Sequence, residues 1–218
     1  MSAKLETFNS REEWLRNRKK GIGGSEISAV VGLNPWCSNV ELWEYKTGRS
    51  ERPAVTSEEA VRYGVAAEPL IRELYKLDHE SYKVEYSEFN SWSNDLYPWA
   101  LASLDGWMWD DKGRPGVLEI KTSEIRRAQD WDKWSDKVPD NYFCQILHYM
   151  AVTEAVFADL RAHIVYTKED GERRAMIRDY HVERADVEED IAYLMNKGAE
   201  FWEKVVNNEA PALILPGI

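Results

Sequence analysis

The chain has 218 residues, 44% apolar and 31% charged, which is enough to bury a core and typical of an ordinary globular protein. Its net charge of −11 argues against a protein that coats nucleic acid through charge alone. The chain has neither a run of 18 apolar residues nor a hydrophobic N-terminal segment, which argues against a membrane protein or an exported one. We therefore expect a single cytoplasmic domain over residues 1–218.

The first third of the chain is predicted to be helical. Ser25, after a glycine-rich break, is expected to cap a helix, and Ser38 with Glu41 forms a capping box for the next one. Thr56 with Glu59 is expected to begin a longer helix, in which Pro69 produces a kink or a restart. The predicted helices are residues 11–20, 26–31, 38–46 and 56–77.

The pattern changes to extended structure over residues 81–123 and then alternates between strands and helices. Residues 110–115 form a turn signal between two strands, and residues 124–139 predict a loop or short helix. The predicted strands are 101–109, 116–122, 156–160, 162–167 and 175–181, and the predicted later helices are 141–152 and 186–206. The sequence therefore predicts an α/β fold, with a mixed β-sheet flanked by α-helices.

The two strands that flank this turn carry the residues most suited to chemistry. Glu119 and Lys121 alternate with apolar neighbours, so they share one face of their strand. Asp105 lies on the preceding strand and comes beside them if the strands pair across the turn. Taken alone, Glu-x-Lys on a strand favours a salt bridge on a solvated sheet, and it is the added aspartate that favours a catalytic site.

Two carboxylates beside a lysine suit phosphodiester hydrolysis. Asp105 and Glu119, with the backbone carbonyl of Ile120, supply the oxygen ligands that Mg²⁺ prefers, and Lys121 can orient or deprotonate water. We therefore expect a Mg²⁺-dependent nuclease, with Mn²⁺ as a possible substitute for the metal.

The cysteines limit the kind of nuclease that we expect, and two of the tryptophans lie close to the predicted site. Cys37 and Cys144 are too few for an iron–sulfur cluster and are expected to be buried free thiols. Most of the ten tryptophans are expected to serve packing. Trp107 and Trp109 stand apart, because they follow Asp105 along the same strand face.

Asp105 and the segment Glu119-Ile120-Lys121 resemble the core motif of the PD-(D/E)XK nuclease superfamily, although Leu104 replaces its proline. More specific motifs resemble those of the phage lambda exonuclease-type viral recombinases, or alkaline exonucleases. They are R-x-x-G-I-G-G-S-E-I at residues 18–27, Y-G-V-A-A-E-P at 63–69, A-S-L-D-G at 102–106 and Y-F-C-Q-I-L-H-Y-M at 142–150. The resemblance implies a restriction-endonuclease-like core.

The resemblance also implies roles for further residues. Glu68 is an additional catalytic acid near the metal, and Gln145 contacts the scissile region from its helix. Arg18, Ser25 and Ser103 bind a terminal 5′-phosphate of the DNA. His148, on the helix of Gln145, is expected to serve packing.

The activity that the resemblance implies is 5′→3′ digestion of one strand of linear double-stranded DNA. The product is a 3′ overhang for a single-strand annealing protein, and such enzymes form ring-shaped homotrimers. Two alternatives stay open from the sequence. One is a structure-specific or restriction-type endonuclease, and the other is a catalytically silent protein that binds DNA ends.

Overall fold

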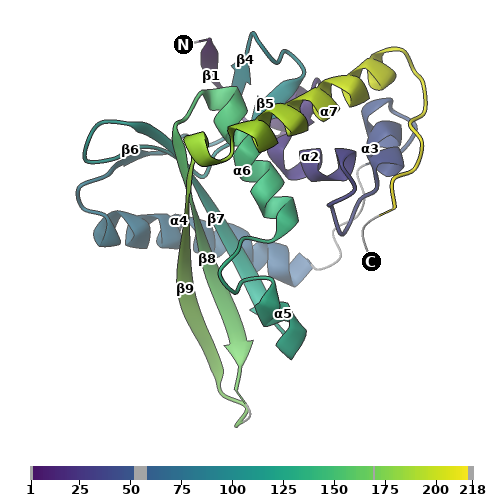
Figure 1. Ribbon diagram of the computed structural model, residues 1–218. Coiled ribbons are helices and arrows are strands. Elements are labelled where there is room, and N and C mark those ends of the chain that lie inside the picture. Colours follow the sequence, from purple (N-terminus) through teal and green to yellow (C-terminus); the bar gives the residue numbers. More distant parts are fainter. Residues whose placement is uncertain (1, 52–57, 169, 216–218) are drawn as a thin grey trace.

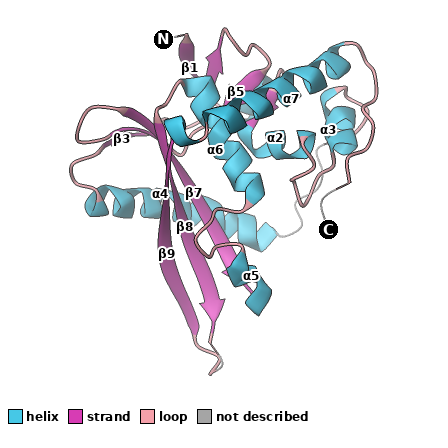
Figure 2. Cartoon of the chain, in the orientation of Figure 1, coloured by secondary structure: helices cyan, strands magenta, loops and turns pink. Residues whose placement is uncertain are grey.

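The computed structural model describes residues 2–51, 58–168 and 170–215, which form two β-sheets flanked by helices (Figures 1 and 2). The larger sheet has the strand order β3-β6-β7-β8-β9, and the smaller one has the order β1-β4-β5-β2. The strands are β1 (Ala3–Thr7), β2 (Ile22–Gly23), β3 (Lys83–Glu85), β4 (Asn90–Asn94), β5 (Ala100–Ala102), β6 (Gly106–Trp109), β7 (Pro115–Ile125), β8 (Phe157–Thr167) and β9 (Arg173–Glu183).

The helices cover both faces of the larger sheet (Figure 1). Helix α4 packs on one face, and α6 packs on the other face and also contacts the smaller sheet. The helices are α1 (Arg11–Arg18), α2 (Gly24–Val30), α3 (Asn39–Lys46), α4 (Glu58–Asp78), α5 (Ala128–Asp132), α6 (Asp140–Thr153) and α7 (Glu188–Val206), with a 3₁₀ turn at Arg184–Asp186. None of the helices within the described ranges is long and apolar enough to cross a membrane.

Strand β7 is the centre of the larger sheet. It pairs antiparallel with β6 across the 110–114 turn, and it pairs parallel with β8, which requires the crossover that α5 and α6 supply. Alternation along β7 divides its side chains between two cores. Val117 belongs to the main core around α6, whereas Leu118 and Ile120 belong to a smaller core under α4.

The predicted α/β class is confirmed, and so are the hairpin of β6 and β7 and the two helices of the last third. The smaller sheet was not predicted, because β2 and β5 have only two and three residues and pair with distant segments. The segment after residue 123 contains the short helix α5, and the predicted break at Arg161 is absent, since β8 is one continuous strand.

Two predicted helix boundaries were wrong. Ser25 is not an N-cap, because α2 begins at Gly24, two residues before the predicted start, and its N-cap is Gly23. The carboxylate of Glu26 accepts a hydrogen bond from the backbone N–H of Gly23 at 2.8 Å. Pro69 does not interrupt α4. It lies on the exposed side of the helix with Val65, where water can satisfy the carbonyl that loses its partner. Thr56, the predicted start of this helix, lies outside the described residues.

Candidate active site

The predicted core residues come together at the junction of β6 and β7. Asp105 immediately precedes β6, and the pairing of Gly106 with Leu118 brings it beside Glu119. Its carboxylate accepts a hydrogen bond from the backbone N–H of Ile120 at 2.8 Å. The hairpin predicted from the 110–115 turn therefore brings Asp105 beside Glu119 on β7, as expected.

Glu119 is buried, with 2% of its side chain exposed. Its Oε1 atom accepts hydrogen bonds from the amide of Gln145 at 2.8 Å and forms an ion pair with Lys121 Nζ at 2.5 Å. Its Oε2 atom has no hydrogen-bond partner among the described residues. An unsatisfied buried carboxylate oxygen is costly, so this atom is available to a cationic ligand.

The three acids of the site resist ionisation. Burial, together with the charge of Asp105, raises the pKa of Glu119 to about 8 and the pKa of Glu68 to about 7. Burial also raises the pKa of Asp105, against the opposing effect of Lys121. Although burial disfavours its charge, the carboxylate of Glu119 holds the pKa of Lys121 above its usual value. Lys121 is therefore a charged hydrogen-bond donor at neutral pH.

Glu68 reaches the site from α4 together with a residue that the sequence did not point to. Arg72, one helical turn after Glu68, donates to its carboxylate and also donates from Nε to the backbone carbonyl of Asp105 at 2.5 Å. Its guanidinium lies 3.5 Å from the ring centroid of Tyr86. The i,i+4 spacing of Glu68 and Arg72 was a possible signal, but nothing in it indicated the contact with Asp105.

Gln145 lies on α6 and connects Glu119 to a second residue that was not predicted. Its Nε2 atom donates to Glu119 and also to the hydroxyl of Tyr149 at 2.9 Å. The ring of Tyr149 packs on Gly24, where a Cβ atom would lie 2.2 Å from the ring. This contact joins the carboxylate cluster, which consists of Glu68, Asp105 and Glu119, to the start of α2. His148 serves packing, since it is buried and its Nε2 atom lies 3.0 Å from the carbonyl oxygen of Leu101.

The carboxylate cluster fits a divalent cation. Glu119 Oε2 lacks a partner, and Asp105 lies next to it with a raised pKa. The carbonyl of Ile120 points to the same side as its N–H, toward Asp105. Within the described ranges, no group of three or more His, Cys, Asp or Glu side chains is arranged to hold a metal. The candidate ligands are instead the carboxylates of Asp105 and Glu119 and the backbone carbonyl of Ile120, all of which are oxygen donors.

The three residues expected to bind a phosphate also lie close together. Arg18 Nη2 donates to the exposed hydroxyl of Ser25 at 3.0 Å. The Arg18 guanidinium lies 4.8 Å from the ring centroid of Trp14, and the Trp14 indole donates to Ser103 Oγ at 3.1 Å. Trp14 therefore links Arg18 to Ser103, which lies two residues before Asp105.

A profile of the YqaJ-like viral recombinase domain matches residues 13–156, which is more than half of the chain. The chain belongs to the YqaJ-like viral recombinase family. The protein YqaJ of Bacillus subtilis (strain 168) is 31% identical over 212 residues, which cover 94% of this chain and 59% of that protein. This chain thus spans less than two thirds of its relative. Membership of this viral recombinase family, predicted from the motifs, is confirmed.

Solved structures confirm the PD-(D/E)XK fold of this YqaJ-like chain. The alkaline exonuclease LHK-Exo from Laribacter hongkongensis superposes with a TM-score of 0.66 at 18% identity, over 90% of this chain and 93% of that one. A phage-related exonuclease from Haemophilus somnus 129PT gives a TM-score of 0.53 at 11% identity, over 93% and 91% of the two chains. At these identities the likeness establishes the fold, and residue roles rest on the site itself.

Proposed function

We propose that the protein is a divalent-cation-dependent exonuclease that degrades one strand of linear double-stranded DNA from the 5′ end. The 3′ single-stranded overhang that remains is the substrate of single-strand annealing. The observation that carries this proposal is the unpartnered Glu119 Oε2 atom beside Asp105 and Lys121. Such a centre suits a reaction in which water attacks phosphorus and a P–O bond of the backbone breaks.

Each residue of the cluster has a distinct task. Lys121 orients the attacking water and stabilises negative charge on the phosphate, because its raised pKa keeps it protonated. Asp105 and Glu119, with the Ile120 carbonyl, hold Mg²⁺, or Mn²⁺ in its place. When bound, the cation supplies Lewis-acid stabilisation of the charge that develops on the phosphate oxygens.

Gln145 and Glu68 complete the centre. The amide of Gln145 fixes one oxygen of Glu119, which leaves the other oxygen directed to the ligand. Glu68, whose pKa of about 7 lets it take up or release a proton near neutrality, suits proton transfer to or from the scissile region.

Recognition of the DNA end is assigned to Arg18, Ser25 and Ser103. An arginine offers a planar fork of donors to phosphate oxygens, and the two hydroxyls add further hydrogen bonds. Stacking on Trp14 and the hydrogen bond to Ser25 hold the guanidinium in place before DNA arrives. A 5′-phosphate bound here would align the next phosphodiester with Asp105.

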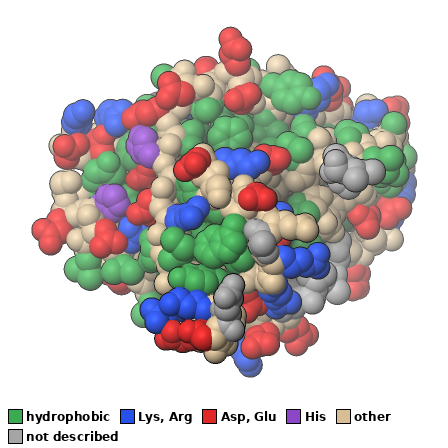
Figure 3. Space-filling model, turned by 60° about the horizontal axis from the view of Figure 1, so that its bottom comes forward, with side chains coloured by type: hydrophobic (Ala, Val, Ile, Leu, Met, Phe, Trp, Pro, Cys, Tyr) green, Lys and Arg blue, Asp and Glu red, His purple; other side chains and the backbone are tan. Residues whose placement is uncertain are grey.

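We also propose that the protein works as a homotrimer and delivers its product to an annealing protein. The net charge is −11, and on the face in Figure 3 the Lys and Arg side chains alternate with Asp and Glu instead of forming one basic surface. A single copy would therefore hold DNA weakly, whereas a closed ring retains DNA by topology. Light scattering of the purified protein tests the trimer.

Digestion of linear duplexes with one labelled end tests the exonuclease. With Mg²⁺ we expect mononucleotides from the 5′-ended strand, faster digestion of 5′-phosphate than of 5′-hydroxyl ends, and no cleavage of covalently closed circles. Arg18→Ala should lose most of the phosphate preference and keep some cleavage of 5′-hydroxyl ends. Cleavage of the circles would identify an endonuclease instead, and end binding without nucleotide release would identify a silent protein.

A further inference from the structure

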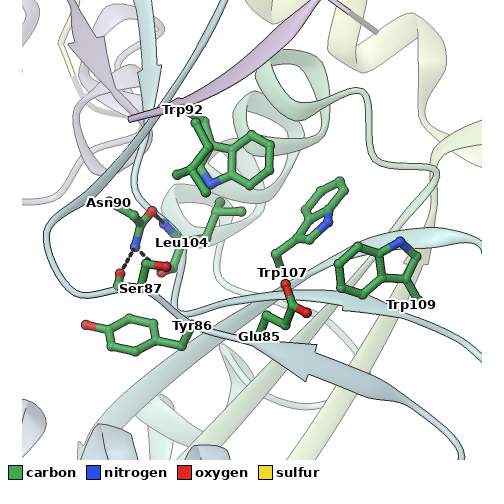
Figure 4. A pocket seen from close by; sticks show the side chains of 9 residues that line it. Glu85, Tyr86, Ser87, Asn90, Trp92, Leu104, Trp107 and Trp109 are labelled. Atoms are coloured by element: carbon green, nitrogen blue, oxygen red, sulfur yellow. Dashed lines mark hydrogen bonds between the residues drawn. The ribbon is translucent and has the colours of Figure 1, made fainter. Parts of the chain in front are cut away.

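An aromatic hollow opens between the two sheets, next to the candidate active site (Figure 4). It has a volume of about 230 Å³, and the indoles of three tryptophans surround it. Its lining residues are Leu5, Glu85, Tyr86, Ser87, Asn90, Trp92, Leu104, Trp107 and Trp109. We refer to it as the tryptophan pocket.

The walls of the tryptophan pocket are suited to a flat aromatic ligand. The ring centroids of Trp92 and Trp107 are 4.8 Å apart, and those of Trp107 and Trp109 are 5.9 Å apart with nearly perpendicular planes. Pockets for drug-sized molecules have volumes of about 300–1,000 Å³, so this smaller one fits a single ring system. Tyr86 is 43% exposed and provides an accessible ring at the opposite end.

Two lining residues of the tryptophan pocket, Tyr86 and Trp107, lie close to the carboxylate cluster. Tyr86 lies against the Arg72 guanidinium, which donates to Glu68 and to the carbonyl of Asp105. Trp107 pairs with Val117, two residues before Glu119, so Trp107 and Glu119 lie on the same face of the sheet. Two residues along a strand span about 7 Å, which places the pocket within about one nucleotide of the cluster.

We propose that the tryptophan pocket binds an unpaired nucleobase of the DNA strand whose phosphate lies at Asp105. The proposal rests on the proposed function, since a nuclease that digests one strand of a duplex must separate that strand from its complement. Stacking on aromatic side chains tolerates every base, because each base has a flat π-face. The pocket would hold the separated base and keep the strand directed into the site.

The charges around the tryptophan pocket are compatible with a nucleotide. Glu85 at the pocket forms an ion pair with Lys83 at 2.6 Å, which offsets its negative charge. Lys83 Nζ lies 4.7 Å from the ring centroid of Trp109. A base stacked on this ring would therefore bring its phosphate within reach of the Lys83 ammonium. Asn90 does not contribute a donor to the ligand, since both of its amide hydrogen bonds go to the carbonyls of Ser87 and Leu104.

A double-mutant cycle, in which the protein and the DNA are changed separately and together, tests the pocket. Affinity for a 5′-phosphorylated duplex end would be measured by anisotropy with Ca²⁺ in place of Mg²⁺, because Ca²⁺ should support binding with little turnover. Abasic sites would replace the first four nucleotides of the 5′ strand in turn. The variants are Trp109→Leu and Tyr86→Leu, with Tyr193→Leu on α7 as a matched control at an aromatic residue that is 59% exposed.

With the wild-type protein and Tyr193→Leu, one abasic position should weaken binding about 5- to 100-fold. The same abasic position should have little further effect in Trp109→Leu or Tyr86→Leu, which have already lost the stacking partner. Equal abasic penalties in all four proteins would overturn the proposal. Normal DNA binding by both pocket variants, with loss of binding to an annealing protein, would overturn it in favour of a protein-docking site.

Digestion by the wild-type protein in Mg²⁺ would be measured in parallel, so that the two proposals fail separately. Absence of digestion rejects the proposed function. If the wild type digests DNA, but an abasic position weakens binding equally in the wild type and in the pocket variants, the nucleobase site alone is rejected.

Discussion

A cluster of charged residues lies at each face of the larger sheet, and the two clusters differ in how their carboxyl groups are satisfied. Glu119, on the α6 face, leaves one carboxylate oxygen without a partner among the described residues. Its pKa is raised, chiefly by burial, and so are the pKa values of Asp105 and of Glu68, which reaches this cluster from α4. On the α4 face, Arg161 is buried and binds Asp179 through two hydrogen bonds of 2.8 and 2.7 Å and Asp78 through one of 2.7 Å.

Asp159, another carboxylate of the α4 face, is equally well satisfied. Asp159 accepts hydrogen bonds from the hydroxyl of Tyr75 and from the ring of His181. Although burial disfavours the charge of His181, its hydrogen bonds to Glu183 and Asp159 raise its pKa. Both clusters combine carboxyl groups with basic residues, so their composition does not separate them. The unpartnered oxygen and the raised pKa values do, and they support the proposal that the cluster around Glu119 binds a ligand.

The largest expected difference between the faces is in hydrolysis. Glu119→Gln keeps the shape of the side chain but removes the charge, and we expect it to reduce DNA hydrolysis by about 100-fold or more. Asp159→Asn, the matched change at a buried acid of the other face, should leave the rate per folded molecule within about twofold. Release of labelled mononucleotides in Mg²⁺ measures both. Similar losses in the two variants would mean that the faces do not differ in function.

A smaller effect is expected on stability, and it should be confined to the α4 face. Arg161→Met leaves Asp78 and Asp179 without their shared partner. Because both aspartates are partly exposed, we expect a loss of about 1–3 kcal/mol, below the range for fully buried pairs. Lys197→Met, which breaks a surface ion pair with Glu200, should cost at most about 0.5 kcal/mol. Urea unfolding measures both, and equal costs would contradict the structural role of Arg161.

The smallest effect concerns the pH dependence of stability without metal. The pKa of Glu119 is about 8 in the folded protein and near 4.5 in the unfolded chain. Between pH 4.5 and pH 8, the folded state therefore binds more protons at this group than the unfolded state does. Its contribution to stability therefore falls as pH rises through this window. In EDTA, Glu119→Gln should raise the melting temperature above that of the wild type at pH 8.5 and change it little at pH 4.5. A difference that does not depend on pH would contradict the raised pKa.

The arrangement of candidate site residues on β7 could be predicted from sequence because its geometry is local. A turn at 110–115 fixes the pairing of the strands around it, and alternation then places Glu119 and Lys121 on one face. Asp105 follows from the same hairpin. Glu68, Gln145 and the phosphate residues came from the family motifs, since no local pattern connects α1, α4 or α6 to the hairpin.

The parts that were not predicted depend on tertiary packing. Arg72 looks like an ordinary helix residue until α4 is docked against the loop that holds Asp105. Tyr149 joins the site only because Gly24 lets α2 approach its ring closely. The tryptophan pocket requires β4 of one sheet to face β6 of the other. Trp107 and Trp109 stood out in the sequence, whereas Trp92 carried no signal.

We propose that the carboxylate cluster around Glu119 holds a divalent cation and that the charge cluster on the α4 face does not. Binding of Mn²⁺, followed by the loss of the free-ion signal in electron paramagnetic resonance, tests it directly at pH 8. Wild type and Asp159→Asn should bind Mn²⁺ with similar affinity, and Glu119→Gln should bind it at least about tenfold more weakly. Unchanged binding in Glu119→Gln, or loss of binding in Asp159→Asn alone, would contradict the assignment.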